Sequence, residues 1–273
     1  MNFCIEYLKS FHRLLGITDL KLKKERENFF YQHKNYDWKN IPIFIVSYNR
    51  LSYLKKLVQQ LENRGYVNIK IIDNASTYKP LLDYYDTVSY DIFRLKKNDG
   101  HMAFWKNDVF DYYRRDLYVV TDPDVSIIDE CPNDFIQVFY RYLENYPRLR
   151  KVGFSLRIDD IPKEATLYDK VTKWEKAYTR FKIPFNNAYT ADIDTTFALY
   201  LPDHLDCSRR FLTAIRTGYP YQLRHLPWYK IKDAITEEDR YYSKVKTNGF
   251  WNEIKGELTE EGKIGENTGW ISK

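Results

Sequence analysis

Short apolar runs alternate with helical patterns over the first two-thirds of the chain. The stretch IPIFIVSYNR, residues 41–50, is dense in β-branched residues and ends in polar ones. Residues 51–65, LSYLKKLVQQLENRG, follow with helical periodicity and end at Gly65. A second apolar run, NIKIIDNAS, begins at residue 68. A strand, a helix of about 15 residues and a strand predict a parallel unit with a right-handed crossover.

Three further apolar runs extend the alternation: DIFRLKK, DLYVVTD and KVGFSLR. We expect a helix from about residue 103 to 113 between the first two. After residue 160 the sequence is aromatic and broken by prolines, which predicts a second lobe on the same sheet. The pattern therefore predicts an α/β protein with an open, mostly parallel sheet flanked by helices and a C-terminal lobe.

The two ends of the chain differ from this alternation. Residues 3–15 place apolar side chains on one helical face, and residues 20–34 continue as a basic helical segment, so residues 1–40 are expected to form a helical extension. This extension either packs on the domain or docks through residues 1–37 on a membrane surface. The polar residues 256–273 are expected to form a tail that is mobile or lies over the surface.

Composition narrows the class of protein. Of 273 residues, 44% are hydrophobic and 17% aromatic, which is enough for a sizeable core. The 3 cysteines are far apart and odd in number, which favours a reducing, cytoplasmic location. No run approaches the roughly 20 apolar residues of a membrane span. The net charge of +5 favours anionic partners weakly, but no nucleic-acid-binding signature appears, so we expect no nucleic acid.

Polar residues gather directly after the apolar runs. They are Ser47, Tyr48, Asn49, Arg50, Asp73, Asn74, Gly100, Asp122 and Asp124. Each alone is typical of a helix cap or a turn. In an open parallel sheet, however, the carboxyl ends of the strands meet at one edge, where ligands bind. Together these residues therefore predict a site for a large polar anion.

The stretch TDPDV carries the clearest chemistry. Asp122 and Asp124 lie one residue apart on a turn stiffened by Pro123. Two such carboxylates suit Mg²⁺ or Mn²⁺, which share their remaining positions with water and phosphate oxygens. The metal would neutralise a diphosphate leaving group. A nucleophile and acid pair of the glycosidase kind needs a separation of about 5 Å or more, which these residues reach only by facing apart.

Four segments, IPIFIVSYNR, IIDNAS, KKNDGHMAFWKND and VVTDPDV, resemble in order and spacing the nucleotide-sugar-binding half of a GT-A-fold glycosyltransferase, closest to the family 2 type. The resemblance is specific over residues 41–126. It implies a single catalytic domain over residues 41–255, with the nucleotide-sugar half at 41–126 and the acceptor half at 127–255. The implied reaction moves a sugar from a nucleoside diphosphate-sugar, with UDP or dTDP, to a hydroxyl of a glycan or lipid-linked glycan.

The resemblance also implies roles for single residues. Residues 47–50 would lie along the nucleotide, Asp73 would hydrogen-bond the base beside Asn74, and Gly100 would form the turn beneath the sugar nucleotide. Asp122 would reach ribose, metal or sugar, and Asp124 would bind the metal. Proline between these two aspartates departs from the family pattern, which usually has an aromatic or acidic residue there.

The acceptor half offers weaker candidates. His225 follows a strand-like stretch and is the preferred third metal ligand, with a hydrogen-bonded core histidine as the alternative. An inverting transfer also needs a general base. Asp194, in ADIDTTFALY, is the first candidate. Glu238, in TEEDRYY, is the second, although capping by Thr236 explains that segment well.

Two other functions stay open at this point. A nucleotidyltransferase that makes the sugar nucleotide would share the sheet and the metal carboxylates, but it needs a glycine-rich loop after the first strand. VSYNRLSY contains no glycine. A non-catalytic glycan-binding module would use the aromatic residues for binding and the acidic pair only for structure.

Overall fold

A computed structural model describes residues 19–206 and 213–245 and the two-residue strands at 251–252 and 257–258. The helical face expected at residues 3–15, Cys4 and Cys207 lie outside the described residues, as does most of the expected tail. Residues 257 and 258 of that tail form a strand, β11 (Glu257–Leu258), which pairs with β10 (Trp251–Asn252).

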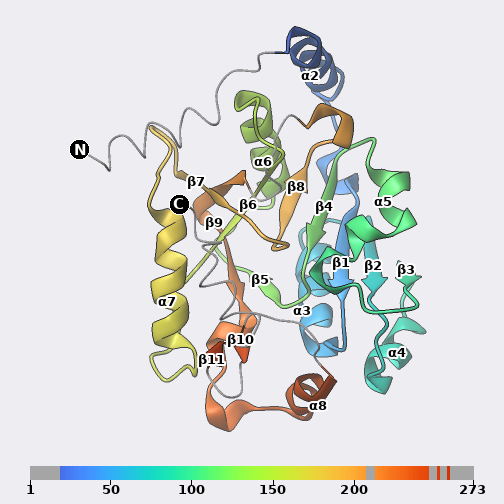
Figure 1. Ribbon diagram of the computed structural model, residues 1–273, viewed down its shortest axis with the longest axis vertical. Coiled ribbons are helices and arrows are strands. Elements are labelled where there is room, and N and C mark those ends of the chain that lie inside the picture. The colour runs from blue at the N-terminus through green and yellow to red at the C-terminus, as the bar shows by residue number, and fades with distance from the viewer. Residues whose placement is uncertain (1–18, 207–212, 246–250, 253–256, 259–273) are drawn as a thin grey trace.

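Four parallel strands form the first half of the main sheet (Figure 1). They are β3 (Asp91–Arg94), β2 (Ile69–Asp73), β1 (Ile43–Ser47) and β4 (Tyr118–Thr121), in this spatial order. In the register of β1 and β2, Ser47 lies opposite Asp73. The strands expected from the apolar runs are therefore present, and their carboxyl ends share one edge.

The second half of the sheet mixes directions. Its strands are β8 (Ala198–Tyr200), β6 (Lys151–Leu156), β9 (Thr213–His225), β5 (Val125–Ile127) and β7 (Ala188–Asp192). β8 pairs antiparallel with β4 and β6, whereas β6 and β9 are parallel, and both β5 and β7 pair antiparallel with β9. The predicted α/β class, an open sheet flanked by helices with a second lobe on the same sheet, is confirmed.

Helices cover the sheet on both faces. The α-helices are α2 (Leu20–Gln32), α3 (Leu51–Glu62), α4 (Lys79–Tyr85), α5 (Asp108–Tyr113), α6 (Phe135–Asn145), α7 (Tyr168–Lys176) and α8 (Glu237–Val245). Short 3-10 turns lie at η1 (Trp38–Asn40), η2 (Gly100–Met102), η3 (Phe104–Lys106), η4 (Ala177–Thr179), η5 (Asp203–Leu205), η6 (Leu226–Tyr229) and η7 (Lys232–Ala234). Ile43 and Ile45 of β1 pack in the core with α3 and α6, whereas Phe44 and Val46 pack in a second core with Phe104.

The helix expected from residue 103 to 113 is broken into η3 and α5. Asn107 has extended backbone angles, φ −126° and ψ 160°, and its side-chain amide donates to the carbonyl of Ala103 at 2.7 Å. An amide side chain that satisfies a nearby carbonyl competes with helical hydrogen bonds, which explains the interruption.

Helix α2 is anchored to the domain by a buried arginine. Asp19 caps its first turn by accepting from the backbone of Lys21 at 2.9 Å. The Arg26 guanidinium donates to the carbonyls of Leu143 at 3.0 Å and Leu205 at 3.1 Å. Together with buried Phe29 and Phe30, this contact directs the apolar side of α2 into the protein. Within the described residues, no helix combines the length and the apolar character that crossing a bilayer requires.

Replacing Gly153 tests the packing of β6 against β8. A Cβ at this position would lie 2.3 Å from the Phe197 carbonyl oxygen and 2.9 Å from the Ala198 Cα, both backbone atoms. Because strand backbones cannot give way as side chains do, Gly153→Ala is expected to lower the free energy of unfolding by about 3 kcal/mol. Urea unfolding measures the loss, with exposed Val67→Ala as the control. A wild-type urea midpoint for Gly153→Ala would show that the strands separate easily.

Candidate active site

The carboxyl ends of β2 and β3 are joined by an asparagine. The Asn74 amide donates to the Asn98 side chain at 2.8 Å and to the Gly100 carbonyl at 3.0 Å, and its oxygen accepts from the Asp99 backbone at 2.8 Å. Gly100 has φ 72°, a conformation that side chains disfavour. The expected turn glycine therefore stands in a turn, and Asn74 fixes that turn beside β2.

The loop after β1 is also held in place by side-chain hydrogen bonds. Asn49 has φ 53°, and its side-chain oxygen accepts from the backbone of Thr77 at 2.7 Å and Tyr78 at 2.8 Å. Its own backbone N–H donates to the Ser76 hydroxyl at 3.0 Å. Asn49 thus joins the loops after β1 and β2 into one rigid edge, while the hydroxyl of neighbouring Tyr48 donates to the carbonyl of Val245 in α8 at 3.0 Å.

Asp73 is buried at the end of β2 and already accepts protein donors. The Tyr85 hydroxyl lies 3.2 Å from its Oδ1, and the Ser76 N–H lies 3.3 Å from its Oδ2. Burial raises the pKa of Tyr85, and the negative charge of Asp73 raises it further, so the phenol stays protonated as a donor. These contacts are those of a turn residue, and a contact from Asp73 to a base remains a prediction.

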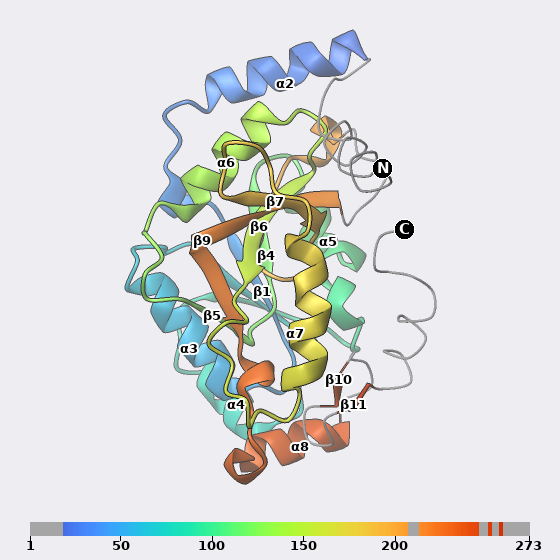
Figure 2. The same cartoon turned by 90° about the vertical axis from the view of Figure 1, so that its left-hand side faces the viewer.

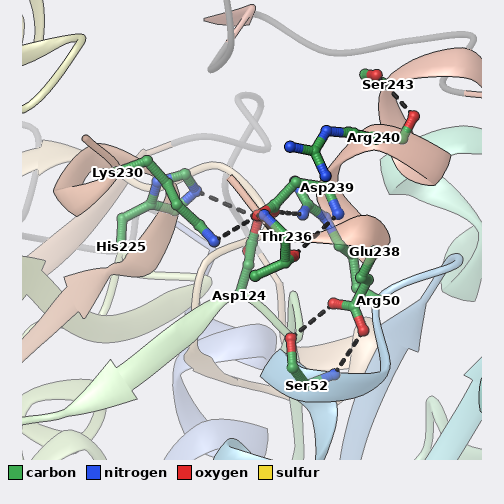
Figure 3. Close-up of polar contacts among 10 residues, drawn as sticks. All are labelled: Arg50, Ser52, Asp124, His225, Lys230, Thr236, Glu238, Asp239, Arg240 and Ser243. Atoms are coloured by element: carbon green, nitrogen blue, oxygen red, sulfur yellow. Dashed lines mark hydrogen bonds and ion pairs between the residues drawn. The ribbon is translucent and has the colours of Figure 1, made fainter. Parts of the chain in front are cut away.

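A backbone pairing brings His225 to the acidic pair. β5 begins directly after Asp124, and its first residue, Val125, lies opposite His225 of β9. The Leu226 N–H donates to the Asp124 carbonyl at 2.8 Å. The His225 Nε2 then lies 3.7 Å from the Asp124 Oδ2 (Figure 3). The structure therefore unites two of the three predicted metal ligands, which are 101 positions apart in the chain.

Both members of this pair hold a buried polar atom that lacks a hydrogen-bond partner among the described residues. These atoms are the Asp124 Oδ1 and the His225 Nδ1. A buried polar atom without a partner costs about 1–3 kcal/mol, so proteins keep few of them without a reason. At Asp124 the free acceptor faces neither a donor nor bulk water, as expected of a carboxylate that binds a cation.

Asp122 lies in a cluster of negative charge. The Thr195 hydroxyl donates to its Oδ2 at 2.8 Å. Burial raises the pKa of Asp122 well above its usual range, and the charges of Asp124 and Asp194 raise it further. The segment that holds Asp194 and Thr195 thus reaches the acidic pair, and the exposed Asp194 carboxylate adds to the cluster.

A buried lysine hydrogen-bonds the backbone of the segment that holds Asp194 and Thr195. Lys151 is fully buried in β6, and its ammonium donates to the carbonyl of Asp194 at 3.0 Å and to the Tyr200 hydroxyl at 3.3 Å. Burial lowers the pKa of Lys151 to about 7, while the charge of Asp194 acts in the opposite direction. Lys151 therefore fixes the backbone at Asp194, next to the threonine that holds Asp122.

The residues present fit a divalent cation in part. The free Oδ1 of Asp124 and the clustered carboxylates are what a cation would neutralise. Nowhere in residues 19–206, 213–245 or the two short strands do three or more His, Cys, Asp or Glu side chains form a group that could hold a metal. Mg²⁺ is commonly bound by one or two carboxylates together with substrate phosphates, and Asp124 is the carboxylate here that such an ion would use.

A buried ion pair ties the loop after β1 to α8. The Arg50 guanidinium donates to Asp239 at 2.6 Å (Figure 3). Its central carbon lies 3.9 Å from the centre of the Tyr242 ring. The ammonium of Lys230 donates to the same carboxylate at 2.7 Å. Arg50 is thus paired inside the protein, and a contact from Arg50 to a nucleotide remains a prediction.

Glu238 is bound at the start of α3. One of its oxygens accepts from the Ser52 N–H at 3.0 Å and the other from the Ser52 hydroxyl at 2.6 Å. Thr236 and Asp239 cap α8 reciprocally, since the Asp239 N–H donates to the Thr236 hydroxyl and the Thr236 N–H donates to the Asp239 carboxylate. The capping expected for TEED is present, and Glu238 itself caps a second helix.

The sequence did not single out four residues that shape this site. Lys151, Lys230 and Asp239 are bound through tertiary contacts, and their types and spacing carry no local signal for them. Thr195 had a weak signal, because it stands where relatives of the resembled family often have glycine. Its hydroxyl contact with Asp122 follows only from the folded arrangement.

Comparison with known proteins adds little. No protein-family profile matches the sequence, and no curated protein matches it either. Among solved structures, similarity is found to the crystal structure of S. aureus TarS 1–349, a wall teichoic acid glycosyltransferase, with a TM-score of 0.36 and 12% identity. The match covers 60% of this chain and 47% of that one, so this chain matches about half the length of that structure. At this TM-score the function must be argued from the site itself.

Removing the charge of Asp239 tests how much its buried ion pair with Arg50 contributes to stability. Asp239→Asn leaves the Arg50 guanidinium buried without its carboxylate, so the free energy of unfolding should fall by about 3 kcal/mol at neutral pH. Lys230, Thr236 and Arg50 lower the pKa of Asp239 to about 2 despite its burial, so its contribution is present above about pH 4 and is lost as the pH falls toward 2. The difference from wild type should shrink over that range.

The control is exposed Glu237→Gln on the same helix, which should cost less than about 1 kcal/mol. Chemical unfolding at several pH values measures both variants. Equal losses in the two variants would show that the ion pair contributes no more than the charge of a helix start.

Proposed function

We propose that this protein is a metal-dependent glycosyltransferase that moves a sugar from a nucleoside diphosphate-sugar to a hydroxyl acceptor. The observation that carries the proposal is the meeting of Asp122, Asp124, His225 and the segment of Asp194 at the carboxyl edge of the sheet. A cluster of carboxylates beside a free buried acceptor suits a cation and the phosphates that it binds. The resemblance of residues 41–126 to the nucleotide-sugar half of such enzymes agrees with this edge.

The donor side consists of the strand-end loops after β1, β2 and β3. Asp73 ends β2 and Asn74 follows it, Ser47 ends β1 and Tyr48 follows it, and Gly100 opens η2. We assign UDP or dTDP as the nucleotide, because an acceptor carboxylate suits the N3–H of uracil or thymine. Mn²⁺ or Mg²⁺, held by Asp124 and the phosphates of the donor with His225 and Asp122 nearby, would supply positive charge opposite the diphosphate as it leaves.

The acceptor side consists of the segment after β7. Asp194 is exposed, belongs to the acidic cluster and has its backbone fixed by Lys151. We assign it as the general base that takes the proton from the acceptor hydroxyl in an inverting transfer. Glu238 is the weaker candidate, because both of its oxygens accept hydrogen bonds from Ser52. The acceptor that we propose is a glycan or lipid-linked glycan of surface polysaccharide or glycolipid synthesis.

The metal assignment is tested by Asp124→Asn. This change removes charge but little volume, so the fold should persist while Mn²⁺-dependent binding of UDP falls by a factor of about 100. Calorimetric titration of UDP with and without Mn²⁺ measures the effect. Exposed Asp129→Asn, five positions further along, is the matched control and should bind as wild type does. Absence of UDP binding in wild type would favour the glycan-binding module, and unchanged binding in Asp124→Asn would remove the metal site.

The base assignment is tested by Asp194→Asn. Loss of a general base should lower turnover by a factor on the order of 100 or more, with donor and metal affinity unchanged. Glu238→Gln should lower the unfolding temperature through the lost cap of α3 and leave turnover per folded enzyme nearly unchanged. Product analysis with a panel of donors measures the turnover of both variants, and thermal unfolding measures the effect of the lost cap. A large loss of nucleotide affinity in Asp194→Asn would place this residue in the donor site, and a retained anomeric configuration would contradict inversion.

A further inference from the structure

The outer side of α7 is a basic surface. Lys170, Lys173 and Lys176 recur every third residue and are exposed, whereas Val171 and Glu175 of the same helix are buried. Three-residue spacing keeps these lysines on neighbouring positions of one helix side. In Figure 2, α7 lies at the front of the molecule and faces the viewer. The helix thus directs its cations away from the sheet.

The positive charge continues past the helix. Arg180 and Lys182 are exposed, and Glu175 is buried against the Arg216 guanidinium. Exposed Asp169, at the start of α7, is the acidic residue that this stretch of the chain shows to solvent beside its five exposed cations. We call this set, Lys170, Lys173, Lys176, Arg180 and Lys182, the α7 basic surface.

Two exposed aromatic rings lie beyond the α7 basic surface. Phe185 is 108% exposed, and Tyr219, at the irregularity within β9, is 54% exposed. Asn187 joins the two segments, because its carbonyl accepts from the Gly218 N–H at 2.7 Å and its amide donates to the Tyr219 carbonyl. A phenyl ring left fully in water costs hydrophobic free energy that a partner would recover.

We propose that the α7 basic surface and the tip at Phe185 and Tyr219 bind an anionic lipid bilayer. Cations near a surface of anionic headgroups contribute about 1 kcal/mol each. Aromatic rings insert at the level of the headgroups, where they meet both apolar and polar groups. A soluble polyanion would use the cations alone, whereas a bilayer uses the cations and the exposed phenyl ring together, so the bilayer accounts for both features.

The position of the tip relates this surface to the acidic cluster, a step that rests on the proposed function. The chain runs from Phe185 through β7 to Asp194 in nine residues. At about 3.3 Å per residue, the two lie no more than about 30 Å apart. A bilayer bound at the tip would thus hold a lipid-linked acceptor within about 30 Å of Asp194. This surface is distinct from α2, whose Phe29 and Phe30 pack inside the protein.

Vesicle co-sedimentation tests the proposal with the full chain and no nucleotide. The vesicles contain phosphatidylcholine alone or with roughly a third phosphatidylglycerol. The triple variant Lys170→Glu, Lys173→Glu, Lys176→Glu should weaken binding to the anionic vesicles at least tenfold, and Phe185→Ser should weaken it severalfold. The matched control, Lys21→Glu, Lys23→Glu, Lys24→Glu on α2, changes the net charge equally and should bind as wild type does.

Three results would overturn the proposal: equal losses in the two triple variants, equal binding to neutral vesicles, or full binding by Phe185→Ser with complete competition by soluble polyphosphate. Thermal unfolding confirms that each variant is folded. UDP and Mn²⁺ titration of the same variants separates the two proposals. If the wild type binds UDP but not anionic vesicles, only the proposed lipid surface is contradicted. If it binds vesicles through α7 but does not bind UDP, only the proposed transferase function is contradicted.

Discussion

The candidate site depends on the antiparallel pairing of β5 with the end of β9. This pairing sets Val125 opposite His225 and lets the Asp124 carbonyl accept from Leu226, so residues from the two halves of the chain meet at one point. Because strand register shifts in whole residues, a slip by one would turn His225 to the other face of the sheet. The meeting of aspartate and histidine is thus specified by backbone hydrogen bonds before any ligand is present.

Charge is arranged in two different ways around this edge. Asp239 and Glu175 are buried against the guanidiniums of Arg50 and Arg216, where they join elements of the fold. At Asp122, by contrast, burial raises the pKa well above its usual range, and the nearby charges of Asp124 and Asp194 raise it further. Paired carboxylates stabilise the structure, whereas crowded ones are held at a cost and favour a cation or a proton. This contrast separates the structural acids from those suited to chemistry.

The sequence was sufficient for the parallel half of the sheet and for the strand ends, because apolar runs and the polar residues that follow them are local signals. Ser47, Asp73, Gly100 and Asp122 lie at that edge as expected. The helix expected over residues 103–113 failed at Asn107, whose side chain competes with the backbone. Arg50 and Glu238 have long-range partners in Asp239 and Ser52 that the sequence did not predict, and their roles along a nucleotide and as a general base stay predictions. Such partners, like Lys151 beneath Asp194, have no local sequence pattern.

Helix α8 holds the strand ends at which we propose that the donor binds. Arg50 and Ser52 belong to the loop and helix start after β1, and their partners lie in one helical turn of α8. The Tyr241 hydroxyl donates to Thr77 after β2 at 2.9 Å, so the same helix also holds the next strand end. Preorganised polar groups stabilise developing charge better than groups that must move. By bonding to two strand ends from the C-terminal lobe, α8 preorganises the edge of the sheet at which we propose that the donor binds.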